Sequence, residues 1–81
     1  MTVDQNQKID AEVNACGLHC PLPVLRLKKA LSSLQSGQIV KVRVTDPQSV
    51  RDFAAFAKQA GHQMIEVRAQ DGEWSVLIQK S

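Results

Sequence analysis

The stretch Asn14-Ala15-Cys16-Gly17-Leu18-His19-Cys20-Pro21-Leu22-Pro23 separates a segment with the pattern of a strand from a segment with the pattern of a helix. Proline is tolerated in the first turn of a helix, because the N–H that it lacks would have no partner there. Pro21 and Pro23 therefore predict a helix start, which Gly17 precedes in the connecting loop. Cys20 should lie at or next to the N-cap of that helix.

A cysteine at this corner is expected to be reactive. The helix N-terminus carries about half a positive charge, and its free N–H groups should point toward the sulfur of Cys20. Free cysteine titrates near ~8.5, and helix N-termini with nearby cations lower this pKa to ~3.5–7.5. The dipole contributes only ~0.3–1 kcal/mol, so a further decrease requires a cation such as Arg26 or Lys29. The alternative is that Cys20 is simply a small buried apolar residue, which the loop-to-helix corner argues against.

Length and composition predict one small globular domain. The chain has 81 residues, of which 43% are hydrophobic and 22% charged, which argues against disorder. Two cysteines do not make a disulfide scaffold. The sequence shows neither a signal peptide nor an apolar run of the ~20 residues that a membrane span requires, so a cytoplasmic protein is expected. A net charge of +2 argues against nucleic-acid binding.

The elements on either side of the corner follow from hydrophobic periodicity. Residues 1–8 are expected to form a flexible tail, and residues 9–81 a single domain. Lys8 to Asn14 alternates as a half-buried strand does, with Ile9, Ala11 and Val13 on one face. Pro21 to Leu34 has helical periodicity. Its apolar stripe consists of Val24, Leu27, Ala30, Leu31 and Leu34.

The second half of the chain repeats this alternation of strand and helix. Ile39 to Val44 is expected to be a strand, and a second helix should begin at Asp46 or Ser49 and end at Gly61. The inner face of that helix is expected to contain Val50, Phe53, Ala54, Ala57 and Ala60. Two further strands, Gln63 to Gln70 and Glu73 to Gln79, flank Asp71-Gly72, a strong signal for a type I′ hairpin. Their inward residues are expected to be Ile65, Val67 and Ala69, and Trp74, Val76 and Ile78.

The element order β-α-β-α-β-β predicts a two-layer sandwich of the α/β (α+β) class. Each helix has a single apolar stripe, which must be buried against a sheet. Because three of the strands have one polar face, both helices should cover the same face of a mixed four-stranded sheet. The first two strands should be parallel if they are in contact, and the last two antiparallel.

Two leucines of the first helix do not belong to its apolar stripe. Leu22 and Leu25 lie on the opposite side, one turn from Arg26 and Lys29. They are interpreted either as scattered surface hydrophobes or as an apolar contact patch for an acidic protein partner beside Cys20.

Gly17-Leu18-His19-Cys20-Pro21-Leu22-Pro23, followed by Val24-Leu25 and a lysine-rich helix, resembles the TusA (SirA-like) sulfur-carrier family. The resemblance continues through Thr45-Asp46-Pro47, Gly61-His62 and Asp71-Gly72, and covers the chain from about Ile9 onward. It implies the same two-layer fold. The run Ala15-Cys16-Gly17 is similar to that of relatives linked to sulfur oxidation.

The resemblance implies that Cys20 carries sulfane sulfur as a persulfide. The donor would be a cysteine desulfurase or a rhodanese-like protein, and the acceptor a DsrE/TusD-like protein. The pathway would be sulfur oxidation, tRNA thiolation or molybdenum-cofactor synthesis. The protein would then act as a sulfurtransferase in a persulfide relay, with no cofactor and no bound metal. Persulfide transfer is the attack of a thiolate on a sulfane sulfur.

Other interpretations stay open. Cys16 is either a packed loop residue or a secondary thiol that resolves the persulfide as a disulfide with Cys20. Zinc binding by Cys16, His19, Cys20 and His62 lacks a second ligand pair of suitable spacing. The alternative functions are a nucleic-acid-binding module that uses its open sheet face, and a thiol–disulfide redox protein that uses Cys16 and Cys20.

Overall fold

The structure, a computed structural model, describes residues 9–81 and confirms the predicted order of elements. In chain order the elements are β1 (Ala11–Asn14), α1 (Leu22–Ser32), β2 (Ile39–Val44), α2 (Pro47–Ala60), β3 (Gln63–Gln70) and β4 (Glu73–Gln79). The tail predicted for residues 1–8 lies outside the described residues.

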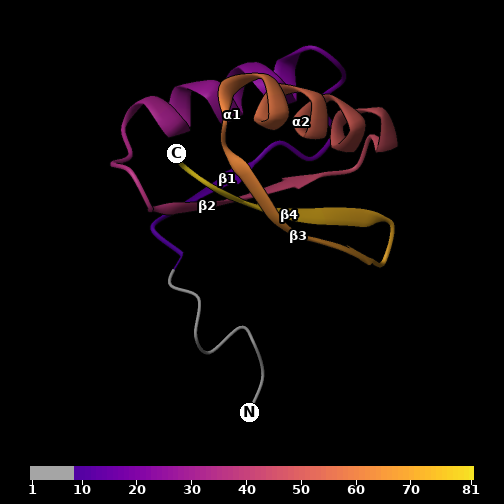
Figure 1. The fold of residues 1–81 in the computed structure, drawn as a ribbon. Coiled ribbons are helices and arrows are strands. Elements are labelled where there is room, and N and C mark those ends of the chain that lie inside the picture. The colour runs from indigo at the N-terminus through magenta and orange to yellow at the C-terminus, as the bar shows by residue number, and fades with distance from the viewer. Residues whose placement is uncertain (1–8) are drawn as a thin grey trace.

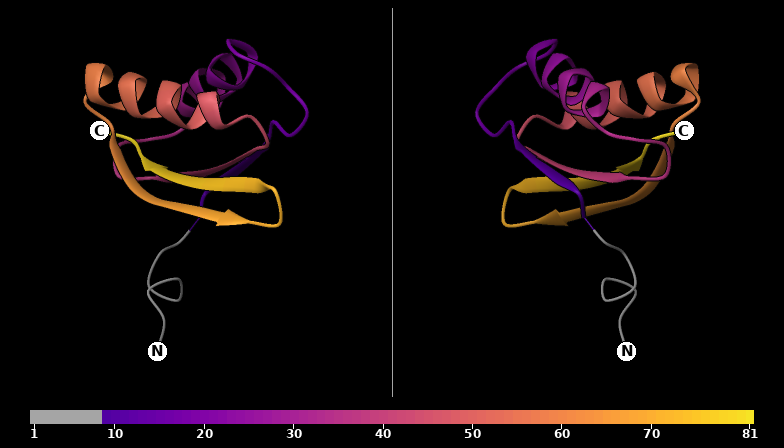
Figure 2. Two further views of the ribbon diagram at one scale, coloured as in Figure 1. Left: turned by 90° about the vertical axis from the view of Figure 1, so that its right-hand side faces the viewer. Right: turned by 90° about the vertical axis from the view of Figure 1, so that its left-hand side faces the viewer.

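The four strands form one sheet in the order β1-β2-β4-β3, and both helices cover the same face of it (Figures 1 and 2). β1 and β2 are parallel, as predicted, because α1 crosses over between them. β3 and β4 form the predicted antiparallel hairpin, and β4 also pairs antiparallel with β2. The predicted two-layer sandwich with a mixed sheet is therefore confirmed.

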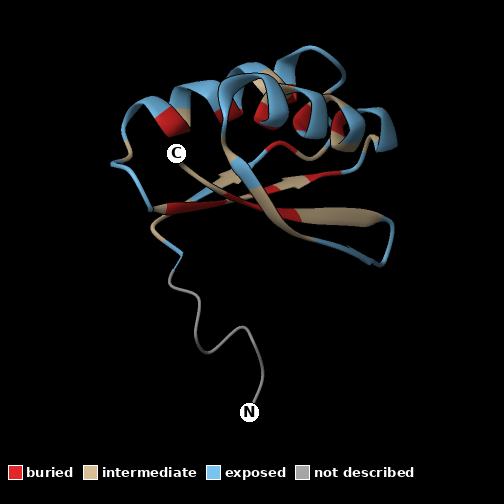
Figure 3. Ribbon diagram, in the orientation of Figure 1, coloured by how far each residue is buried: buried red, intermediate tan, exposed pale blue. Residues whose placement is uncertain are grey.

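The hydrophobic core lies between the helices and the sheet, where the buried parts of both layers face each other (Figure 3). The two central strands contribute alternate residues, since successive side chains of a strand point to opposite faces. The buried apolar residues at the centre of the core are Ala15, Leu27, Leu31, Val40, Val42, Val44, Phe53, Val76 and Ile78. Phe53, a residue of α2, has the largest fully buried side chain among the described residues.

α1 is shorter than predicted at its C-terminal end. The helix ends at Ser32, and Leu34 N–H then bonds to the carbonyl oxygen of Leu31 at 3.0 Å, in a tighter turn. The Lys80 ammonium donates to the carbonyl oxygens of Leu31 and Leu34 at 2.8 and 2.9 Å. Because the last carbonyls of a helix lack partners within it, this lysine from the far end of the chain stabilises the helix terminus.

α2 begins and ends as its sequence predicted. The Asp46 carboxylate is the N-cap and accepts the Gln48 N–H at 3.0 Å, and Gly61 ends the helix with φ 80°. The predicted inner face is wrong at Ala54 and Ala60, which are exposed. The face that packs on the sheet instead includes Ser49, whose exposed fraction is only 1%.

The residues predicted to face the core are partly wrong at β1 and in β3. β1 begins only at Ala11, and Ile9, which precedes it, is 43% exposed on the sheet face away from the helices. In β3 an irregularity between Met64 and Glu66 shifts the register, and Val67 is 45% exposed while Ala69 is also exposed. β3 is an edge strand, and its end near the hairpin lies farther from the helices than its start (Figure 2).

Substitution of Gly61 by Ala is expected to lower the free energy of unfolding by about 1–2 kcal/mol. The glycine has φ 80°, a left-handed conformation that L side chains rarely adopt, and an added Cβ would meet no atom within 4 Å. Backbone strain alone therefore causes the loss. Urea unfolding measures it, with Gly61→Asn as the control, since asparagine tolerates this conformation better. Equal stability of Gly61→Ala and the native protein would contradict the prediction.

Candidate functional site

The loop between β1 and α1 is held against the connection from β2 to α2. Ala15 is fully buried, and its N–H donates to the Arg43 carbonyl oxygen at 2.8 Å, which extends the pairing of β1 with β2. Gly17 turns the chain with φ 81°, and its N–H donates to Thr45 Oγ1 at 2.9 Å. These bonds fix the corner that the sequence placed before the first helix.

Cys20 lies directly before Pro21, which is the N-cap of α1, as predicted, and its side chain is exposed with a free thiol. The peptide bond between them is cis. The helix start offers fewer free N–H donors than expected. Pro21 and Pro23 have no N–H, and the Leu22 N–H donates to the His19 carbonyl oxygen at 2.9 Å. The prolines that mark the helix start thus also remove two of its donors.

The predicted decrease in the pKa of Cys20 is wrong, and the structure raises this pKa instead. The main cause is the Asp52 carboxylate, whose interaction with the sulfur favours the protonated thiol. Desolvation and the negative charges of Asp52 and Asp46 act in the same direction. The cations that were expected to favour the thiolate lie elsewhere, since Arg26 and Lys29 line a shallow hollow between α1 and β1.

The acidic groups beside Cys20 come from the first turns of α2. Asp46 faces His19, with 3.8 Å between Asp46 Oδ2 and His19 Nδ1, and the His19 side chain is 88% exposed. Asp52 Oδ1 accepts a long bond of 3.4 Å from Gln48 Nε2. Asp52 Oδ2 and Ser49 Oγ are both buried and have no hydrogen-bond partner among residues 9–81. Sequence reasoning did not assign Asp52 to the site.

Cys16 has a different environment from Cys20. Its thiol is half-buried and approaches Glu73 Oε2 at 3.8 Å. Glu73 in turn binds the Arg43 guanidinium at 2.9 Å, and that hydrogen bond holds the pKa of Glu73 below its ordinary value. Both cysteines are free thiols, so no disulfide joins them in the part of the chain that is described. Cys16 therefore belongs to a polar cluster at the hairpin end of the sheet.

The leucines beside Cys20 are accessible, as the contact-patch interpretation requires. Leu22 and Leu25 are each 50% exposed, one turn apart on the outer side of α1. Pro23, by contrast, is buried against the core. Both interpretations of these leucines, scattered surface hydrophobes and a contact patch, require this exposure.

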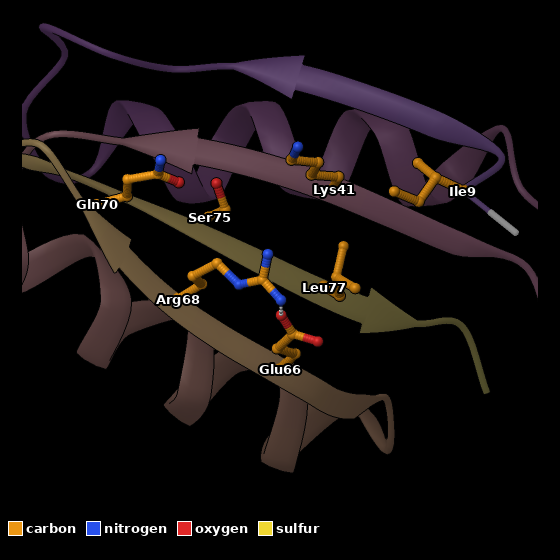
Figure 4. Close-up of a pocket in the computed structure, with 7 residues that line it drawn as sticks. All are labelled: Ile9, Lys41, Glu66, Arg68, Gln70, Ser75 and Leu77. Atoms are coloured by element: carbon orange, nitrogen blue, oxygen red, sulfur yellow. Dashed lines mark ion pairs between the residues drawn. The ribbon is translucent and has the colours of Figure 1, made fainter. Parts of the chain in front are cut away.

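A pocket that does not include Cys20 lies on the sheet face that the helices leave open (Figure 4). It has a volume of about 240 Å³ and its polar lining includes Lys41, Glu66 and Arg68. Arg68 is paired with Glu66 at 2.9 Å, which reduces the positive charge that this face presents. No cluster of three or more metal-ligating side chains occurs among residues 9–81. Neither described helix is long and apolar enough to span a membrane.

Comparison with known proteins decides the family. Residues 11–80 match the family model described as Sulfurtransferase TusA. The chain belongs to the TusA family. It is 51% identical over 72 residues to the sulfur carrier protein TusA of Allochromatium vinosum, covering 89% of this chain and 95% of that one. The TusA of Pseudomonas syringae pv. syringae is 37% identical over 76 residues, with 94% and 90% covered.

A solved structure places the same fold in this family. The crystal structure of a SirA-like protein from Desulfitobacterium hafniense matches with a TM-score of 0.78 and 35% identity, over 85% of this chain and 95% of that one. The resemblance drawn from the Gly-Leu-His-Cys-Pro-Leu-Pro run is thereby confirmed.

Proposed function

We propose that this protein is a cytoplasmic sulfur carrier that holds sulfane sulfur as a persulfide on Cys20. The observation that supports this most is the exposed, free thiol of Cys20 at the corner before α1. A carrier must present one sulfur to two different partners in turn, so an accessible thiol at a protruding corner suits that task. The family membership supports the same role.

The chemistry is an exchange of one sulfur atom between thiols. The Cys20 thiolate attacks the terminal sulfur of a donor persulfide, a new S–S bond forms, and the donor S–S bond breaks. The donor leaves as a thiolate and takes up the proton that Cys20 lost, so that a thiol and a persulfide exchange identities. Unloading is the same step in reverse, with an acceptor thiolate attacking the terminal sulfur on Cys20.

The partners proposed are a sulfur donor of the cysteine desulfurase or rhodanese-like class and an acceptor of the DsrE/TusD-like class. Leu22 and Leu25 supply the exposed apolar contact beside the reactive sulfur, and Arg26 and Lys29 lie on the same helix. Interfaces commonly combine an apolar centre with a charged rim, and the charges set the association rate. The protein turns over as a sulfurtransferase only together with these partners.

The alternative functions receive less support. A nucleic-acid interface on the open sheet face would need free cations, yet Arg43 binds Glu73 at 2.9 Å and lies 3.9 Å from Glu12. A redox protein would need Cys16 and Cys20 to face each other, whereas Cys16 faces Glu73.

The test is to incubate the reduced protein with a sulfane-sulfur donor and to weigh it intact. A cysteine desulfurase with cysteine and a rhodanese with thiosulfate serve as the two donors. The expected result is a gain of one sulfur atom that a reductant reverses. A protein that gains no sulfur from either donor would contradict the proposal.

Substitution of Cys16 by Ser should leave this sulfur gain unchanged. The Cys16 thiol is half-buried and approaches Glu73 Oε2 at 3.8 Å, so it is less accessible to a donor protein than the exposed Cys20 thiol. Cys16 is therefore not expected to hold sulfur itself. The measurement is the mass gain of the variant under the same conditions. Loss of loading in Cys16→Ser, with the fold retained, would assign the persulfide to Cys16 instead.

A further inference from the structure

β3 forms a long edge of the sheet with little protection against pairing with another strand. It is the last strand in the order β1-β2-β4-β3, and within residues 9–81 no strand pairs with its outer side. Proteins commonly shield such an edge with proline, lysine, a bulge or a very short strand. β3 spans eight residues, Gln63–Gln70, with neither proline nor lysine, and its one irregularity lies near its start, between Met64 and Glu66. β1, at the other edge, has only four residues.

The backbone of β3 directs hydrogen-bonding groups to this free edge. The residues that flank a two-residue turn such as Asp71-Gly72 exchange hydrogen bonds, and Gln70 is one of them. Along an antiparallel strand, residues bonded to the partner alternate with residues whose N–H and C=O groups point away from it. Counted back from Gln70, the residues whose backbone groups point to the free edge are therefore Ala69 and Val67.

The side chains around Val67 form a self-complementary pattern. Val67 pairs with the buried Val76, so it lies on the sheet face that the helices cover, yet it is 45% exposed. Glu66 and Arg68 flank it on the opposite face, where both line the pocket (Figure 4). If a second β3 strand pairs antiparallel with this one about Val67, each Glu66 lies opposite an Arg68 of the other strand.

We propose that β3 is a dimerisation edge, and that its partner strand is β3 of a second copy of this chain. The two strands pair antiparallel about a two-fold axis that passes between the two Val67 residues, perpendicular to the sheet. A two-fold interface must be complementary to itself. Val67 meets its own counterpart on the helix side, while Glu66 and Arg68 meet charges of opposite sign on the open side. Opposite charges facing each other across a strand pair stabilise it, and like charges destabilise it.

The charges of β3 favour a second copy over a strand of one strong charge sign. β3 contains one acidic residue, Glu66, and one basic residue, Arg68, so an acidic or a basic strand would be attracted at one position and repelled at the other. Arg68 is held to Glu66 of its own chain at 2.9 Å, and dimerisation extends this pair to four charges that alternate in sign. Because one pair of strands buries less surface than a standard interface, the dimer should be weak and depend on concentration.

The experiment is analytical ultracentrifugation of the full chain at concentrations from about 10 μM to about 1 mM. Glu66→Arg leaves two positive charges on the edge strand, and Arg68→Glu leaves two negative charges. Each variant alone should dimerise at least about tenfold more weakly than the native protein, because like charges then face each other at both positions. An equimolar mixture of the two variants should form a heterodimer, since opposite charges again face each other. Glu12→Arg, the same charge reversal on β1 at the other edge, should leave dimerisation unchanged.

A native protein that stays monomeric at about 1 mM would overturn the proposal. A mixture of Glu66→Arg and Arg68→Glu that forms no more dimer than either variant alone would overturn it as well. If either variant does not fold, amide hydrogen exchange of the native protein decides. The Val67 and Ala69 amides should exchange more slowly as the concentration rises, while those of β1 stay unchanged, and exchange at Val67 that is independent of concentration would overturn the proposal.

The dimer is compatible with sulfur transfer but does not depend on it. β1, which leads into the loop of Cys20, lies at the sheet edge opposite β3, so pairing through β3 leaves the exposed Cys20 thiol of each copy accessible. None of these measurements uses a sulfur donor. Their outcome is therefore independent of whether the protein gains sulfur.

Discussion

Substitution of Cys20 by Ser is expected to abolish the sulfur gain completely while the protein stays folded. Serine has no sulfur with which to form the persulfide, so nothing of the transfer chemistry remains at this position. The side chain is exposed and lies before the N-cap of α1, and no core contact depends on it. Intact mass after incubation with a desulfurase or a rhodanese measures the loss.

Cys16→Ser is the matched control for this substitution, since it removes the same sulfur atom from the same loop. The circular dichroism spectra of both variants should match that of the native protein. Their free energies of unfolding, measured with urea, should lie within about 0.5 kcal/mol of the native value. Full loading of Cys20→Ser would show that another residue carries the sulfur. An unfolded Cys20→Ser would show that the thiol has a structural role, which its exposure does not predict.

Truncation of Phe53 to Ala is expected to have the largest effect on stability, a loss of about 3–5 kcal/mol. Phe53 is fully buried between α2 and the sheet, so its removal loses apolar burial and leaves a cavity. Small domains have little stability to spare, and a loss of this size is expected to unfold a substantial fraction of the molecules. Urea unfolding followed by circular dichroism measures it.

Phe56→Ala provides the comparison, because it deletes the same ring one turn further along α2. Phe56 is only half-buried, with its ring 5.5 Å from that of His62 and 5.3 Å from the Lys28 ammonium. Phe56→Ala should lower the free energy of unfolding by clearly less than Phe53→Ala does, since part of the Phe56 ring is already in water. Equal costs at the two positions would mean that α2 does not pack in the observed orientation.

Much of the fold was predictable because its signals are local. Pro21 and Pro23 located the start of α1, Asp46 and Pro47 the start of α2, and Asp71-Gly72 the hairpin, where both residues have positive φ as a type I′ turn requires. Each of these depends on the conformational preference of a few adjacent residues. The position of Cys20 before α1 could therefore be predicted as well.

The errors fall where distant segments decide burial. Ala54 and Ala60 were predicted on the same inner face as Phe53, yet the stripe that contacts the sheet contains Ser49 and Phe53 and leaves both alanines exposed. Val67 alternates as a buried strand residue should, but its strand lies at the sheet edge. Hydrophobic periodicity in the sequence predicts which face of a helix or strand is apolar. Which other element covers that face is decided by tertiary packing.

The sequence by itself determined the order of elements, their turns and caps, the position of Cys20 at a helix start and the family, because these depend on neighbouring residues and a short motif. Only the tertiary structure decided that β4 lies between β2 and β3, and that α2 places Asp46 and Asp52 beside Cys20. That placement reverses the expected direction of the thiol pKa. Electrostatic effects depend on distance in space, and the distance between Cys20 and Asp52 is set by how two helices pack on one sheet.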